Sequence, residues 1–113
     1  MRKFLLTIIC LSLIIFGLFF DIIKVSGNSM LPDIHNGDIA VIRRNRLTKR
    51  ETSVGDIVIF VNPVTEQLNI KKCTALYGDT IFVTGTNLPE STDSRAFGRI
   101  TKNSIKGWLW INI

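Results

Sequence analysis

Residues 54–84 read VGDIVIFVNPVTEQLNIKKCTALYGDTIFVT and contain three apolar runs separated by turn residues. The runs cover 57–61, 68–75 and 80–84, with an Asn-Pro pair after the first and a Gly-Asp pair before the third. Short runs with this spacing and these boundaries are typical of antiparallel strands. The stretch therefore predicts a strand, the return strand of a hairpin and a third strand.

The flanking sequence continues the same pattern. An apolar run at 39–42 follows an Asn-Gly-Asp turn, and a last run covers 108–113. The segment 85–94 is polar and is predicted to be a loop, and no long helical period follows residue 24. Residues 25–113 are therefore predicted to form one mostly β domain of the barrel or sandwich kind.

The N-terminus has a different character. Phe4 to Phe20 are seventeen consecutive uncharged residues, and twenty residues ending at Ile23 would span about 30 Å as a helix, which is one bilayer core. A cleavable signal peptide has a shorter apolar stretch and a small-residue cleavage site, and no such site follows here. We predict an uncleaved transmembrane anchor over residues 1–24.

Charge predicts the orientation of that anchor and one surface loop. The basic pair Arg2-Lys3 favours a cytoplasmic N-terminus, which places the β domain outside, on the extracytoplasmic face of the cell (plasma or inner) membrane. Five basic residues fall within RRNRLTKR at 43–50. Without interleaved aromatic residues, this run indicates a solvated loop or a contact with anionic lipid headgroups, and no nucleic-acid partner is expected.

The residues that could bind a metal are few. The chain has one histidine, His35, and two cysteines, Cys10 in the apolar segment and Cys73 in the β domain. They are too few and too far apart for a metal shell or an internal disulfide, so no metal and no cofactor are expected. We predict that His35 is an exposed loop residue and that Cys73 is a small buried one.

Four short boxes occur in a fixed order behind the single anchor, and together they resemble type I signal peptidases (S26 family), the Ser-Lys membrane proteases. This resemblance implies a small β core of the signal-peptidase and LexA kind, and a serine endopeptidase that cleaves signal peptides. The boxes are SGNSMLP at 26–32, VGDIVIF at 54–60, IKK at 70–72 followed by GD at 78–79, and GTNLPESTDSRAFG at 85–98.

The resemblance implies that Ser29 is the nucleophile and that a lysine is its base. A serine hydroxyl attacks only when a base takes its proton, and a lysine can do so only when burial lowers its pKa from about 10.4. Strand alternation leaves Lys71 and Lys72 both open, because both faces of the strand carry apolar residues. The family's eight-residue spacing from the base to the aspartate of the GD pair, here Asp79, selects Lys71.

Supporting roles also come from the resemblance. Ser91 matches a serine that hydrogen-bonds and orients the lysine, and Asp93 and Arg95 match a charged pair that braces the site. The oxyanion hole would use the main-chain N–H of the nucleophile, and Gly27 stands where some members have a second, serine donor. Met30 is expected to line the pocket for the small residue before the cut.

Only five residues, 80–84, separate the last two boxes, where the family commonly inserts a longer β segment. The chain therefore resembles compact forms that serve conjugation or pilus systems. The expected partners are the signal peptides of preproteins, the lipid bilayer, and secretion or conjugation machinery.

The alternative function is that of a catalytically inactive, anchored β module that binds preproteins or such machinery. A self-cleaving repressor of the LexA type would need a DNA-binding helical N-terminus in place of the apolar segment.

Overall fold

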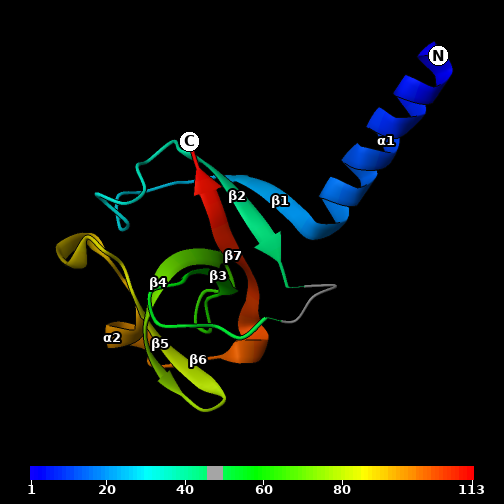
Figure 1. Cartoon of the computed structure of the whole chain (residues 1–113). Coiled ribbons are helices and arrows are strands. Elements are labelled where there is room, and N and C mark those ends of the chain that lie inside the picture. The colour runs from blue at the N-terminus through cyan, green and yellow to red at the C-terminus, as the bar shows by residue number, and fades with distance from the viewer. Residues whose placement is uncertain (46–49) are drawn as a thin grey trace.

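The computed structural model describes residues 1–45 and 50–113, and it is built mostly of strands (Figure 1). This confirms the predicted fold class, a mostly β domain with one apolar N-terminal helix. The elements are α1 (Arg2–Phe19), β1 (Phe20–Lys24), β2 (Ile39–Arg44), β3 (Ile57–Val61), β4 (Leu68–Tyr77), β5 (Thr80–Thr84), the short 3₁₀ helix η1 (Leu88–Glu90), α2 (Ser94–Phe97), β6 (Ile100–Thr101), the 3₁₀ helix η2 (Lys102–Ser104) and β7 (Ile105–Asn112).

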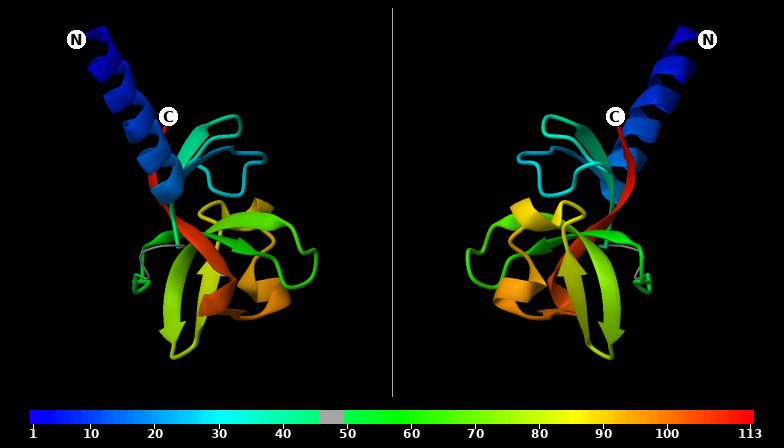
Figure 2. Two further views of the ribbon diagram at one scale, coloured as in Figure 1. Left: turned by 90° about the vertical axis from the view of Figure 1, so that its right-hand side faces the viewer. Right: turned by 90° about the vertical axis from the view of Figure 1, so that its left-hand side faces the viewer.

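The strands of the described residues form one curled antiparallel sheet in the order β1-β2-β7-β3-β4-β5-β6. The runs predicted at 57–61 and 80–84 coincide with β3 and β5, and the hairpin return is β4. The last strand, β7, is longer than predicted and inserts between β2 and β3. The two views of Figure 2 show this sheet curling on itself, while α1 projects away from it.

The helix ends five residues before the predicted anchor boundary at residue 24. Phe20 has extended backbone angles, and Phe20–Lys24 pairs with β2 as an edge strand, with Asp21 opposite Ile42. Hydrophobicity continues across this junction, so the sequence carries no local signal for the change from helix to strand. Within the described part of the chain, α1 is the one helix long and apolar enough to cross a membrane, and none of its residues is buried.

Aromatic rings join the helix to the sheet. Phe16 stacks on Phe20 at a centroid distance of 5.0 Å, and Phe20 contacts Trp110 of β7 at 4.9 Å. These contacts place the last turn of α1 against the end of the sheet that carries the start of β1.

Two apolar clusters lie on the two faces of the sheet. The first surrounds Trp108 and Phe60 and includes Cys73, which is fully buried as predicted. The second joins the segment between β1 and β2 to the sheet, because Met30 and Ile34 pack there with side chains of β2 and β3. This second cluster fixes the position of the segment that carries Ser29.

Three loop predictions have different outcomes. The polar segment 85–94 is not all loop: it contains η1, and its last residue, Ser94, begins α2. The Asp93 side chain caps α2 by accepting a hydrogen bond from the Arg95 N–H. Of the basic run 43–50, the first two residues belong to β2, and 46–49 lie outside the described residues. His35 is exposed in a turn, as predicted.

Candidate active site

Ser29 lies in the segment that connects β1 to β2, and main-chain bonds hold this segment closed. Val25 N–H donates to the carbonyl of Asp38, and Gly37 N–H donates to the carbonyl of Val25, both at 2.8 Å. Gly27 has a φ of 95° and donates its N–H to the side-chain oxygen of Asn36. The half-buried Ser29 side chain therefore projects from an anchored loop.

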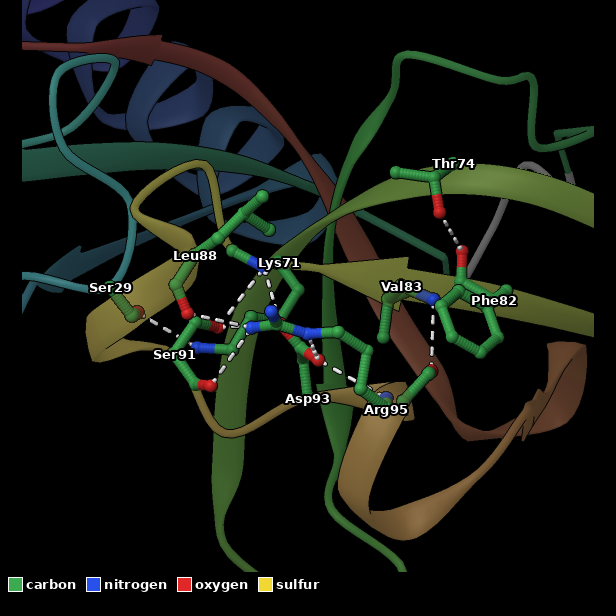
Figure 3. Close-up of polar contacts among 11 residues, drawn as sticks. Ser29, Lys71, Thr74, Phe82, Val83, Leu88, Ser91, Asp93 and Arg95 are labelled. Atoms are coloured by element: carbon green, nitrogen blue, oxygen red, sulfur yellow. Dashed lines mark hydrogen bonds and ion pairs between the residues drawn. The ribbon is translucent and has the colours of Figure 1, made fainter.

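The Ser29 hydroxyl meets one of the two neighbouring lysines. Lys71 lies in β4 opposite Val58, and its Nζ is 2.8 Å from the Ser29 Oγ (Figure 3). The Lys71 side chain is buried, whereas Lys72 lies on the other face of the strand and is half-buried. Burial lowers the pKa of Lys71 below its ordinary value of 10.5, against the opposing effect of the negative charge of Asp93.

Asp93 organises the residues next to this pair. Its carboxylate is fully buried and accepts hydrogen bonds from Arg95 Nε at 2.8 Å, Ser91 Oγ at 2.8 Å and Gly85 N–H at 3.0 Å. Burial alone would raise the pKa of Asp93, but these hydrogen bonds, chiefly from Arg95, lower it to about 2. Asp93 is therefore a fixed negative charge near Lys71.

The Ser91 hydroxyl is bonded differently from the expectation. It donates to Asp93 and accepts the Gly85 N–H at 3.1 Å, and no hydrogen bond joins it to Lys71 among the described residues. Its position over Gly85 makes it part of the carboxylate network. Arg95 completes that network by donating to the carbonyls of Leu88 and Ser91.

Three residues after β5, none of them a predicted site residue, hold the loop of the serine in place. Asn87 N–H donates to the carbonyl of Ser29 at 2.9 Å, and the Thr86 hydroxyl donates to the carbonyl of Leu31 at 2.9 Å. Gly85 packs directly against the Ser29 carbonyl and the Ser91 side chain. The glycine was visible in the last sequence box, but only its neighbours in space show why a side chain is excluded there.

A family model described as signal peptidase, peptidase S26 matches residues 1–82. The chain belongs to this family. Mitochondrial inner membrane protease subunit 1 of Homo sapiens is 32% identical over 113 aligned positions, which cover 81% of this chain and 68% of that protein. The subunit of the same name from Schizosaccharomyces pombe is 28% identical over 108 positions, which cover 77% of this chain and 69% of that protein. These findings confirm the family that the four boxes indicated.

In this S26 peptidase, a cavity of about 300 Å³ opens beside the serine and the lysine. It lies between β1 and the first half of β4, where β4 pairs with β3 alone. Both bordering strand edges can therefore hydrogen-bond to an extended peptide. The lining residues are Ile23, Lys24, Val25, Ser26, Ser29, Ile59, Leu68, Asn69, Ile70 and Lys71.

The structure brings most of the predicted site residues of this signal-peptidase family member together and separates one. Met30 is 1% exposed, packs in the core below the loop, and is not among the described residues that line the cavity. The apolar wall that the sequence assigned to it comes instead from β1, β3 and β4, through Ile23, Ile59 and Ile70.

The depressed pKa of Asp93 leads to a prediction about acid stability. The ionised carboxylate stabilises the fold by about 2 kcal/mol above pH 4, and this contribution is lost as the pH falls from about 4 towards 2. Asp93→Asn is therefore expected to flatten the pH dependence of the free energy of unfolding in that range. Denaturant titrations of the detergent-solubilised chain between pH 2 and 5 measure it.

Asp79→Asn is the matched control, because this exposed carboxylate at the turn between β4 and β5 makes no comparable side-chain contacts among the described residues. In Asp79→Asn the free energy of unfolding should depend on pH as it does in the wild type. An Asp93→Asn protein that loses stability between pH 4 and 2 as steeply as the wild type would contradict the assignment.

Proposed function

We propose that this S26 peptidase is a membrane-anchored serine endopeptidase that cleaves signal peptides from translocated preproteins. The observation that carries the proposal is the 2.8 Å contact between the Ser29 Oγ and the Nζ of the buried Lys71. A buried lysine with a lowered pKa can be neutral at working pH, and a neutral amine at hydrogen-bond distance can take the hydroxyl proton.

The chemistry then runs in two halves. The Ser29 Oγ attacks the scissile carbonyl while the Lys71 Nζ takes its proton, and the lysine returns that proton to the leaving amine. An acyl-enzyme ester on Ser29 remains, and water that gives a proton to the same lysine hydrolyses it. Asp93 opposes deprotonation of the lysine by its charge, so the pKa of Lys71 reflects a balance between burial and this carboxylate.

The developing oxyanion needs hydrogen-bond donors. The Ser29 main-chain N–H has no acceptor among the described residues, which makes it available for this role. Gly27 has no side chain, and its N–H already donates to the side chain of Asn36. A second hydrogen-bond donor to the oxyanion would therefore come from another residue.

Anchoring brings enzyme and substrate to the same surface. We propose that α1 spans the membrane with Arg2 and Lys3 on the cytoplasmic side, and that the β domain acts on the opposite face. A preprotein held in the same bilayer by its own apolar segment then meets the cavity at a high effective concentration. Secretion or conjugation machinery would deliver it.

Ser29→Ala tests the function. The full chain in proteoliposomes should cleave a preprotein with small residues before the cut, and Ser29→Ala should lower the cleavage rate by at least about 10³-fold. Ser26→Ala is the matched control, because this serine lines the same cavity and makes no hydrogen bond to Lys71 among the described residues. It should cleave within a fewfold of the wild type.

The same experiment tests the alternative, an inactive module that binds preproteins. A wild-type chain that binds the preprotein in a pull-down yet leaves it intact would replace the peptidase proposal with that one. Equal cleavage by wild type and Ser29→Ala would exclude Ser29 as the nucleophile.

A further inference from the structure

The face of the sheet that borders the candidate active site is apolar along most of its length and ends in charge. Ile23 of β1 and Val25, the residue after β1, share this face with Asp21. In β2, Ala40 and Ile42 share it with Arg44. The charged end is the one next to α1, since β1 starts where the helix ends.

A second cavity, of about 610 Å³, lies at this charged end. It shares the lining residue Leu68, at the start of β4, with the cavity beside Ser29. Its lining residues are Asp21, Arg44, Asn45, Leu68, Asn103, Ile105 and Lys106.

Two polar atoms in this second cavity are buried and have no partner among the described residues: the Nε of Arg44 and the side-chain oxygen of Asn45. The Arg44 guanidinium is 3.6 Å from Asp21, which is an ion pair longer than a hydrogen bond. Buried donors and acceptors in folded proteins are nearly always satisfied, so the Arg44 guanidinium has hydrogen-bonding capacity beyond its long ion pair with Asp21.

We propose that this cavity binds the substrate several residues before the cut and that Arg44 selects an acidic side chain at that place. The proposal rests on the proposed function. Among the described lining residues, Arg44 and Lys106 outnumber Asp21, and this excess of positive charge suits a carboxylate.

Strand geometry gives the position. From Val25, beside the serine, to Asp21 is four residues, or about 13 Å of extended chain. A peptide lying along β1 covers this length with four residues of its own, so its fifth residue before the cut reaches Arg44. The residues before the cut extend from Val25 towards Asp21, because the membrane segment of the substrate lies before the cut and must approach the end of α1.

The test uses three preproteins that differ only at the fifth residue before the cut, which is Glu, Gln or Lys. The full-length wild type in proteoliposomes should cleave the Glu substrate with a kcat/KM about five- to tenfold above that of the Lys substrate, mainly through KM. Arg44→Gln should bring the three substrates within twofold, and Arg44→Glu should invert the order.

Arg43→Gln is the matched control, because this neighbouring arginine lies on the other face of β2 and should keep the wild-type order. Moving the glutamate to the eighth residue before the cut should abolish the preference. Equal cleavage of the three substrates by wild type would overturn this inference and leave the proposed function standing, whereas no cleavage of any would count against the proposed function itself. The wild-type comparison needs no variant, so it holds even if Arg44 variants fold poorly.

Discussion

Lys71→Ala should lower the rate of preprotein cleavage by at least about 10³-fold, with the protein still folded and inserted in the membrane. The reason is the 2.8 Å contact with Ser29: no other amine touches this hydroxyl among the described residues, so its proton has no acceptor once the lysine is gone. Initial rates in proteoliposomes, with circular dichroism of the purified variant, measure activity and fold separately.

Lys72→Ala is the closest available control, because it removes the same functional group from the next position on the opposite face of β4. We expect near wild-type cleavage. If Lys72→Ala lost its cleavage activity while Lys71→Ala kept it, Lys72 would be the base in place of Lys71. The pH profile adds a second readout: because the base must be neutral, the rate should rise with pH through the lowered pKa of Lys71.

Gly85→Ala should lower the cleavage rate by about two orders of magnitude and the free energy of unfolding by about 1–3 kcal/mol. A methyl group at this position would collide with the Ser91 side chain and with the main-chain carbonyl of Ser29. Neither can move freely, since Ser91 is bonded to Asp93 and the Ser29 carbonyl accepts from Asn87. The methyl group therefore displaces the nucleophile from Lys71.

Gly17→Ala is the control for the substitution itself, because a methyl group there meets nothing within 4 Å. Its activity and thermal unfolding should match those of the wild type. A wild-type kcat in Gly85→Ala would contradict this prediction, because it would show that the added methyl group does not displace Ser29 from Lys71.

Much of the fold was predictable because its signals are local. The strands at 57–61 and 80–84 are bounded by turn residues, and both lie where they were expected. The edge strand Phe20–Lys24 was missed, because Phe20, Ile22 and Ile23 were counted with the apolar segment before them despite Asp21, and because the strand depends on pairing with β2. The strand β7 was placed only in part, since its start at Ile105 is set by pairing with β3.

The site divides in the same way. Ser29, Lys71 and the residues around Asp93 were found because motif spacing is preserved in the sequence, although their catalytic roles remain predictions. Met30 was expected to line the substrate pocket through the family resemblance, yet it packs in the core. Which atoms the Ser91 hydroxyl contacts could not be predicted, because that depends on the approach of β5 to the segment 91–95.

By itself the sequence determined the β class of the domain, the apolar helix before it and the family, since each depends on composition, periodicity or spacing along the chain. Only the tertiary structure shows that Lys71, which the family spacing selected over Lys72, meets Ser29 across 42 residues of chain. It alone shows that Gly85 and Asn87 hold the loop of the serine in place. Strand alternation offers two faces, and the register of β4 against β3 puts Lys71 opposite Val58, on the other face from Ile70.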